Sequence, residues 1–416
     1  MLGGCASELV PTPTVMLPSP TSTAIVTPSS TPTPAPTATP TPSPTATPIP
    51  ITGPPLKVGV LLPYSKGPTQ VGEDIIAGMS LYFDSGGGIV AGRKVELVKE
   101  DEESDPQVTA QKARKLIEQD KVDVLTGLAG SGAAASVRDV AHSSKAILLI
   151  SNASANELSR ARKSPYVFRT SFSNWQLSWA LGAWVAKNVA KKVFVSASDD
   201  ADGKEMVAGF KQTFIPAGGT VDGELFSRPG GNDYAAHLAR IAQAKPGAAF
   251  IFYGGNDAVG FVKQYDQQGL KKDTKITGPG RLTGQHVLPA QGKAALGAIT
   301  TLYWAQTLDN PENKKFVADY RRKYGREPSS YSVQGHDTAR AIAEALAKTA
   351  GDTSDKEKLA KALEGVRFRS PRGSFQFDPT SHNVVQDIYI REVKEVGGKL
   401  VNVAIDSLRS VKDPGK

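Results

Sequence analysis

Small hydroxyl and glycine residues follow two apolar segments of the sequence and could bind an anion. Gly127–Gly132 (GLAGSG) lies between the apolar segment 122–125 and a helical segment that begins at Ala133. Its small side chains let the backbone approach a ligand, and a helix N-terminus offers free N–H groups to a carboxylate. Ser131 adds a hydroxyl donor. Ser151–Ser154 (SNAS) follows the next apolar segment in the same way.

Each of these two stretches, taken alone, is equally well explained as a tight turn or a helix cap. Two such stretches after successive parallel strands would converge on one place, and this favours an anion site. The pattern is neither GxGxxG nor GxxxxGK[ST], so we expect a carboxylate there rather than a nucleotide.

Three further turns could supply polar contacts from a second part of the chain. Tyr253–Asp257 (YGGND) follows an apolar segment and brings Asn256 and Asp257 to its end. Asp202 and Gly278–Arg281 (GPGR) hold corresponding positions after other apolar segments. Each of these alone is most often only a turn.

The sequence lacks the residue patterns of catalysis and of metal binding. Its five histidines lie far apart, with no HExxH pair, and Gly130–Gly132 lacks the outer spacing of a GxSxG nucleophile turn. The single cysteine excludes an internal disulfide and a cysteine-based metal cluster. We therefore expect no enzyme, no cofactor and no metal site.

Apolar segments that alternate with helical segments must position these turns. Strands are predicted at 57–63, 94–99, 122–125 and 146–150, with helices at 72–84, 106–119 and 133–143. The pattern restarts with strands at 192–196, 220–226, 248–253 and 274–277 and helices at 174–189, 204–214, 234–243 and 257–268. Helices at 313–324, 331–349 and 355–363 and a hairpin of strands at 385–392 and 400–406 follow. This predicts an α/β protein with two doubly wound, Rossmann-like units that face each other across a ligand cleft.

Composition restricts the class of protein further. The chain has 416 residues, enough for two domains, and no apolar stretch approaches the roughly 18–20 residues that span a bilayer. The formal net charge is +8, but lysines and arginines are spread along the chain beside acids. We interpret this charge as a solvated basic surface and expect no nucleic-acid partner.

The first 55 residues predict a membrane tether. Leu2–Cys5 (LGGC) fits the processing site of bacterial lipoproteins, so residues 1–5 are interpreted as a signal remnant whose Cys5 carries a lipid. The matching motif is short. In addition, a signal peptide needs an apolar core of about 7–15 residues before the cysteine, and only four residues precede Cys5. Residues 6–55 are almost all Pro, Thr, Ser and Ala, which predicts a disordered, extended tether.

Four blocks of the chain resemble one protein family. Phe83–Pro106 (FDSGGGIVAGRKVELVKEDEESDP) is similar to a block of the type I periplasmic binding proteins, in the leucine/isoleucine/valine-binding branch of ABC-transporter solute receptors. Val124–Ser131, Ile147–Leu158 and Phe250–Gly255 are similar to later blocks, in the same order. The resemblance covers about residues 56–406. It implies two lobes joined by a three-strand hinge, with 56–171 plus 304–374 in lobe one and 172–303 plus 375–412 in lobe two.

The resemblance also implies a set of ligand-binding residues. Ser131 and Ser154, with backbone N–H groups of Asn152 and Ala153, would bind the ligand carboxylate. Tyr64 falls near a family position that lines the cleft, and so does Tyr331. Burial in a core explains these two tyrosines equally well.

The other half of the expected pocket departs from the family pattern. In amino-acid binders of the family, an aromatic residue and a glutamate hold the α-ammonium, whereas Asn256 and Gly280 stand in those places here. Asp202 or Asp257 could substitute as the anion. The ligand could therefore be a branched-chain amino acid held differently, or an aromatic or other organic carboxylate.

These expectations describe an extracytoplasmic solute-binding protein of an ABC importer, anchored to the cell membrane only by lipid. It would be a monomer that closes around a small carboxylate-bearing ligand, with the membrane permease subunits as its partners. The alternative is a ligand-sensing receptor or regulator on the same fold.

Overall fold

The folded part of the chain begins at the end of the predicted tether. The computed structural model describes residues 51–415, so Cys5 and tether residues 6–50 lie outside the described residues. The Arg93 guanidinium donates to the backbone carbonyls of Pro54 and Pro55 at 2.9 and 2.8 Å. These hydrogen bonds attach the described end of the tether segment to the first sheet.

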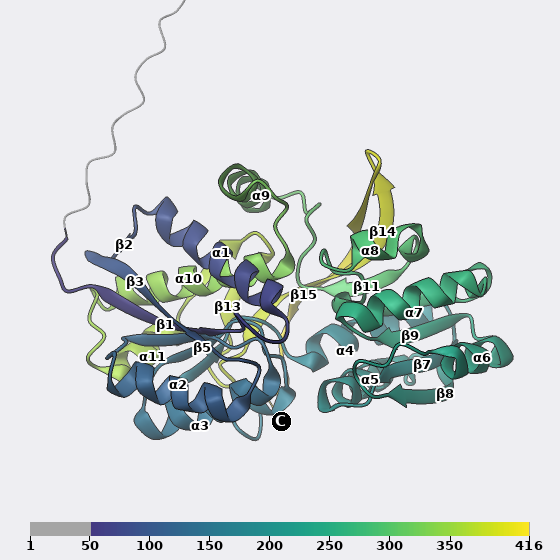
Figure 1. The fold of residues 1–416 in the computed structure, drawn as a ribbon, viewed down its shortest axis with the longest axis horizontal. Coiled ribbons are helices and arrows are strands. Elements are labelled where there is room, and N and C mark those ends of the chain that lie inside the picture. Colours follow the sequence, from purple (N-terminus) through teal and green to yellow (C-terminus); the bar gives the residue numbers. More distant parts are fainter. Residues whose placement is uncertain (1–50, 416) are drawn as a thin grey trace, which may run out of the picture. The chain divides into compact units, whose positions relative to one another are not determined.

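A six-stranded sheet forms the centre of the first lobe, in the order β2-β3-β1-β4-β5-β6 (Figure 1). Its strands are β1 (Leu56–Leu62), β2 (Ile89–Val90), β3 (Arg93–Asp101), β4 (Val124–Gly127), β5 (Leu148–Ile150) and β6 (Val167–Arg169). All neighbours run parallel except β2 and β3. Strand β1 buries Val58 and Val60 in one core and Leu61 in another, which is why its sequence is continuously apolar.

Helices cover both faces of this sheet. Their bounds are α1 (Thr69–Ser85), α2 (Pro106–Glu118), α3 (Ser131–Ser144), α10 (Ser330–Lys348) and α11 (Lys356–Glu364). Helix α2 begins where Asp105 accepts the N–H groups of Gln107 and Val108, with a proline at its first position. Helices α1 and α10 pack closely because Gly78 lacks a side chain; a Cβ there would lie 1.8 Å from the Ser332 carbonyl oxygen.

A nine-stranded sheet forms the centre of the second lobe. Eight of its strands follow the order β12-β13-β14-β11-β10-β9-β7-β8, and β15 pairs with β14. Their bounds are β7 (Lys192–Ser198), β8 (Thr220–Ser227), β9 (Ala248–Phe252), β10 (Lys275–Pro279), β11 (Ile299–Leu302), β12 (Arg367–Ser370), β13 (Gly373–Phe377), β14 (Val384–Val396) and β15 (Lys399–Val411). Strands β7 to β11 pair in parallel, whereas β12 to β15 pair antiparallel.

Helices also lie on both faces of the second sheet. The longer ones are α4 (Asn174–Asn188), α5 (Ala201–Phe214), α6 (Ala235–Ala244) and α7 (Gly255–Gln267), and α8 (Leu288–Gln291) is a single turn. Helix α9 (Pro311–Tyr324) packs instead against α1 of the first lobe. Short 3₁₀ turns are η1 (Asn156–Ser159), η2 (Leu270–Lys272), η3 (Gly280–Thr283) and η4 (Gly292–Ala295). Phe250 and Ile251 of β9 point into different cores, so both faces of the sheet are buried. The predicted fold of two doubly wound α/β units is confirmed.

Buried arginines bind the segments that connect the two sheets. Arg372 donates to the carbonyls of Thr170 and Ser171, which lie between β6 and α4, and pairs with Asp337 of α10 at 2.6 Å. Arg169 donates to the side chain of Asn383, which precedes β14. Because these groups are buried and hydrogen-bonded, the connections are fixed where the chain passes between the lobes.

The hairpin β12–β13 belongs to both lobes. Its backbone pairs with β14 of the second sheet, while Phe375 and Phe377 bury their rings in the core beneath β1. The element pattern of the sequence predicted no strand at β6, β11, β12 or β13. These strands are only three to five residues long, too short for a periodic signal.

Two classes of feature are absent from residues 51–415. No helix in this range is long and apolar enough to cross a membrane. No group of three or more histidine, cysteine or acidic side chains in the same range could hold a metal ion.

Candidate functional site

A cavity of about 580 Å³ lies where strands of both sheets end. The segments after β3, β4 and β5 contribute from the first lobe, and those after β7, β9 and β10 from the second. This is the position at which open α/β sheets bind ligands. The side chains and turns that the argument below uses are Glu102, Ser131, Asn152, Ser154, Asp202, Gly254, Gly280, Arg281, His286, Tyr303 and Tyr331.

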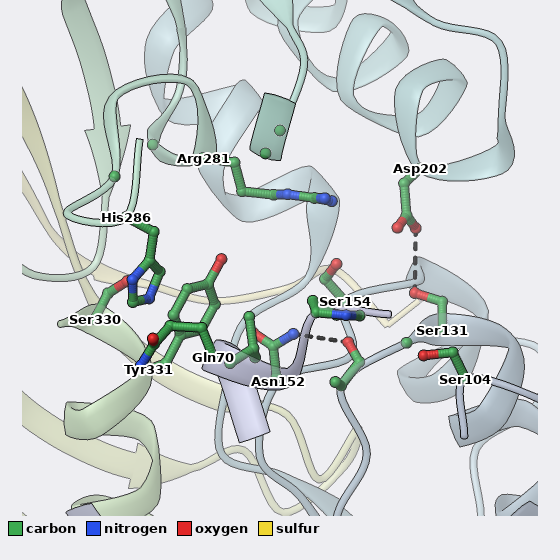
Figure 2. Close-up of a pocket in the computed structure, with 18 of the residues that line it drawn as sticks. Gln70, Ser104, Ser131, Asn152, Ser154, Asp202, Arg281, His286, Ser330 and Tyr331 are labelled. Atoms are coloured by element: carbon green, nitrogen blue, oxygen red, sulfur yellow. Dashed lines mark hydrogen bonds between the residues drawn. The ribbon is translucent and has the colours of Figure 1, made fainter. Parts of the chain in front are cut away.

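The turn between β4 and α3 forms one wall of the cavity. Gly127 has φ of +109°, and a Cβ there would lie 2.0 Å from the Leu61 carbonyl oxygen, so only glycine fits. Helix α3 starts after Gly130 without a side-chain cap, which leaves first-turn N–H groups facing the cavity. The Ser131 hydroxyl donates to Asp202 of the other lobe at 3.2 Å and accepts from the Ala155 N–H (Figure 2).

The turn after β5 contributes two of the three residues predicted there. Asn152 lines the cavity and donates to the Ala129 carbonyl at 2.7 Å, and the buried Ser154 lines it as well. Ala153 does not reach the cavity. Its N–H donates to the Leu128 carbonyl at 3.0 Å and its side chain is buried in the core. The prediction of a ligand-binding N–H at Ala153 is therefore wrong for this conformation.

Arg281 places a positive charge in the cavity from the second lobe. It follows β10 at the start of η3 and is exposed, and its guanidinium lies 5.6 Å from the ring centre of Phe252. Among residues 51–415 it forms no ion pair with a carboxylate. Gly254 provides the room, because a Cβ there would lie 2.7 Å from the guanidinium. Figure 2 shows Arg281 extending into the space between Tyr331 and Asp202.

Aromatic rings line the same cavity. The Tyr331 ring stacks on the His286 imidazole at 5.3 Å and 8°, and the Phe172 and Tyr303 rings lie 5.5 Å apart. Burial is the main cause that raises the pKa of the Tyr331 hydroxyl, and Arg281 opposes this rise. Tyr331 therefore stays neutral near pH 7 and presents both a flat face and a hydroxyl to a ligand.

A second contact between the lobes lies beside this aromatic wall. His286 Nε2 of the second lobe lies 3.1 Å from a carboxylate oxygen of Asp74 on α1. Asp74 is fully buried and also binds Arg326 and Ser329. Burial alone would raise its pKa, but the hydrogen bonds from His286, Ser329 and Arg326 outweigh burial and lower it. The lobes thus touch on two sides of the cavity, at His286–Asp74 and at Ser131–Asp202.

Three acidic residues also line the cavity, and each already has hydrogen-bond donors. Asp202 accepts from Asn174 at 2.8 Å in addition to Ser131, and Asp200 caps α5 through the Gly203 N–H at 2.7 Å. Glu102 is 1% exposed and accepts from the Ala129 N–H at 3.3 Å. Burial raises the pKa of Glu102 to about 7, so this carboxyl is partly neutral near physiological pH.

Three predicted site residues besides Ala153 lie outside the cavity lining. The Tyr64 ring packs against the core of the first lobe, and its N–H donates to Asp101. Asn256 is exposed on the first turn of α7, and Asp257 accepts the Gly230 N–H at 2.8 Å. Strand β9 ends one residue before the expected turn, so Gly254 and Gly255 face the cavity instead.

The remaining predicted residues do line the cavity, together with residues that the sequence argument missed. Ser131, Asn152, Ser154, Asp202, Gly280 and Tyr331 are brought together there. Arg281 was noted only as the end of a GPGR turn, although a cation directly after a strand is a usable signal for anion binding. His286 and Tyr303 carry no local pattern, because the tertiary fold alone brings them to the cavity.

Comparison with known proteins agrees with this architecture. A family model described as periplasmic binding protein matches residues 55–399. "Leu/Ile/Val-binding protein homolog 6" of Brucella melitensis is 33% identical over 366 residues, which cover 86% of this chain and 93% of that protein.

Solved structures of solute-binding proteins from ABC transporters are similar to this chain over most of its length. A solute-binding protein of an ABC transporter from Rhodopseudomonas palustris, in complex with 3,4-dihydroxybenzoic acid, is 36% identical with a TM-score of 0.82. The match covers 86% of this chain and 99% of that one. A second solute-binding protein from that species, in complex with benzoate, is 36% identical with a TM-score of 0.78, over 85% and 98% of the two chains. With its two doubly wound lobes and the cavity between them, this chain belongs to the periplasmic binding proteins, a family of extracytoplasmic solute-binding proteins.

Proposed function

We propose that this protein is the solute receptor of an ABC importer and that its ligand is a small aromatic carboxylate of the benzoate type. The protein binds and releases this ligand and catalyses no reaction on it. The observation that carries the proposal is Arg281, a guanidinium without an acidic partner among residues 51–415, in a cavity lined by aromatic rings.

The charge of the cavity wall favours an anionic ligand. Helices α3 and α7 both begin at the cavity after glycine N-caps that provide no side-chain acceptor. The first-turn N–H groups and the positive helix ends therefore remain available to an anion. Arg281 adds a full charge and can bind both oxygens of a carboxylate at once.

The cavity offers less to an α-ammonium group. Gly280 stands where an acidic side chain would be needed, and Asp202 already accepts from Ser131 and Asn174. Two further relatives point the same way: solute-binding proteins from R. palustris, 31% and 32% identical, are described in complex with 4-hydroxybenzoate. The Leu/Ile/Val-binding relatives make a branched-chain amino acid the competing ligand.

In the proposed cycle, the open form exposes the two lobes to solvent and the ligand carboxylate reaches Arg281 and the α3 turn. The contacts His286–Asp74 and Ser131–Asp202 then stabilise the closed form, whose population the ligand increases. A membrane permease recognises the closed form. A lipid on Cys5 and the Pro/Thr-rich tether hold the monomeric receptor outside the cytoplasm.

The relatives described as transporter proteins favour a role in import over a role as a ligand-sensing receptor.

A ligand panel in a thermal-shift assay tests the proposal. We expect benzoate and hydroxybenzoates to raise the unfolding midpoint, because a ligand that binds only the native state stabilises it by mass action. Leucine and short aliphatic acids should have little effect. A shift with leucine alone would replace the proposed ligand class, and no shift with any carboxylate would contradict the assignment of an anion site.

A further inference from the structure

Arg391 is a buried cation directly behind the second-lobe wall of the cavity. Its side chain, on β14, is fully buried. It donates to the Trp304 carbonyl at 3.0 Å, to the Thr300 hydroxyl at 3.1 Å and to the Gly280 carbonyl at 3.4 Å. All three acceptors are neutral, and its Nε has no hydrogen-bond partner among the described residues.

The other buried arginines of the molecule have acidic neighbours. Arg372 pairs with Asp337 at 2.6 Å, and Arg169 is influenced by the charges of Asp413 and Glu205. Arg391 forms no ion pair with any carboxylate within residues 51–415. A buried charge without a counter-charge is costly, and such groups concentrate at functional sites.

Arg391 interacts with two residues that line the cavity. Gly280 lines the cavity, and a Cβ on it would lie 2.6 Å from an Arg391 guanidinium nitrogen. Tyr303 also lines the cavity, and it is electrostatically coupled to Arg391. Water is largely excluded between these groups, so the guanidinium charge is only weakly screened at the cavity surface.

We propose that Arg391 is a specificity-determining residue, whose unpaired charge behind Gly280 selects ligands that carry a carboxylate but no ammonium group. This inference rests on the proposed function, because it concerns the ligand of the same cavity. Gly280 then has a physical reason to be glycine: a side chain there would collide with Arg391. An amino-acid binder would need an acidic side chain near Gly280 to hold the ligand ammonium. Here the cation Arg391 lies in that region instead, so this wall of the cavity favours an anion over a cation.

Burial lowers the pKa of Arg391 to about 9. The guanidinium is therefore still protonated at pH 7, and its charge is present under the conditions in which the protein works. The Tyr303 hydroxyl stays neutral there, because burial raises its pKa above the ordinary value.

The test compares benzoate with its neutral analogue benzamide by calorimetric titration at pH 7. In Arg391→Gln, which keeps hydrogen-bond donors but loses the charge, we expect the preference for benzoate over benzamide to fall by about tenfold. Arg391→Lys, which keeps the charge, should retain most of that preference. Arg228→Gln removes an exposed cation of the second lobe that lies outside the cavity lining, so it should leave the preference unchanged.

A folded Arg391→Gln variant with the full wild-type preference would overturn the inference while leaving the proposed function intact. Binding of neither compound by the wild-type protein would count instead against the proposed function. If Arg391→Gln does not fold, Arg391→Lys decides. This variant keeps the positive charge, so a folded Arg391→Lys protein that retains the preference for benzoate over benzamide supports the inference, and one that loses the preference contradicts it.

Discussion

Arg281 is the residue on which recognition of the ligand charge depends most directly. A hydrogen bond to a charged group contributes about 1.5–3 kcal/mol, so Arg281→Gln should weaken benzoate binding by about 10- to 100-fold. Calorimetric titration measures this change. Arg228→Gln, which removes an exposed cation of the second lobe outside the cavity, is the matched control. Unchanged affinity in Arg281→Gln would mean that the carboxylate binds elsewhere.

Glu102 predicts a pH dependence of stability. Its pKa is raised by burial to about 7 in the folded protein, from an ordinary value of 4.5, so the folded state disfavours the ionised form. Stability is therefore lost as pH rises from about 4.5 through 7, by roughly 3 kcal/mol at most. Urea unfolding of Glu102→Gln should show no such loss, and the variant should be more stable than the wild type at pH 8 but not at pH 4. A parallel pH profile for both proteins would refute this.

At the scale of elements, the connections between the lobes depend on buried polar contacts. Asp337 of α10 pairs with Arg372, which in turn binds carbonyls of the segment between β6 and α4. Burial would raise the pKa of Asp337, but the charge of Arg372 and hydrogen bonds from His336 and Ser370 lower it. The carboxylate is therefore ionised in the folded protein, and its partner cannot be removed without leaving a buried charge.

Asp337→Asn should consequently lower the free energy of unfolding by about 3–5 kcal/mol, because Arg372 would lose its counter-charge in a buried site. Urea denaturation measures this loss as a lower midpoint concentration, with the dependence of the unfolding free energy on urea concentration unchanged. Asp309→Asn, at a carboxylate that is 84% exposed and pairs with Lys314, should leave stability nearly unchanged, because an exposed ion pair contributes little. Equal effects of the two substitutions would contradict a structural role for the buried pair.

The contact between α1 and the segment after η3 should control closure. His286→Ala removes the hydrogen bond to Asp74 and one face of the aromatic stack with Tyr331. We expect about a tenfold loss of benzoate affinity, because fewer contacts favour the closed form. Small-angle X-ray scattering should show a larger radius of gyration than the wild type at equal, sub-saturating ligand. Identical scattering and affinity would exclude this contact from closure.

The sequence predicted the elements with strong periodicity and missed those without it. Helix α2 was expected at 106–119 and spans 106–118, since Asp105 and Pro106 mark its start. Strand β14 was expected at 385–392 but runs over 384–396, because pairing with β15 extends both strands into the hairpin. The short strands β6, β11, β12 and β13 depend on neighbouring strands for their stability, and no local pattern marks them.

The cavity likewise combines residues that the sequence pattern marks with residues that it does not mark. Ser131, Ser154 and Gly280 follow strands, so their place at the cavity was predictable from topology. His286 reaches the cavity from a loop, and Arg391 of β14 lies behind Gly280, through contacts that only the folded chain creates. Asn256 and Asp257 were misplaced because β9 ends at Phe252 and the chain turns into α7 at Gly255.

At the scale of the whole molecule, the fold explains why recognition uses both lobes. Each sheet brings strand ends and helix N-termini to the cavity, and the chain connects the sheets through segments fixed by Arg169 and Arg372. A ligand that contacts both lobes therefore favours the closed arrangement over the open one. The second lobe supplies both Arg281 and, behind Gly280, the charge of Arg391. The second lobe therefore selects ligands that carry a negative charge.

The most direct measurement is a calorimetric titration of the wild-type protein with benzoate, benzamide and leucine at pH 7. Our account predicts that benzoate binds, that benzamide binds more weakly because it lacks the charge that Arg281 and Arg391 attract, and that leucine does not compete with benzoate. Tight binding of leucine, with benzoate binding weakly or not at all, would contradict the claim that this cavity selects aromatic carboxylates.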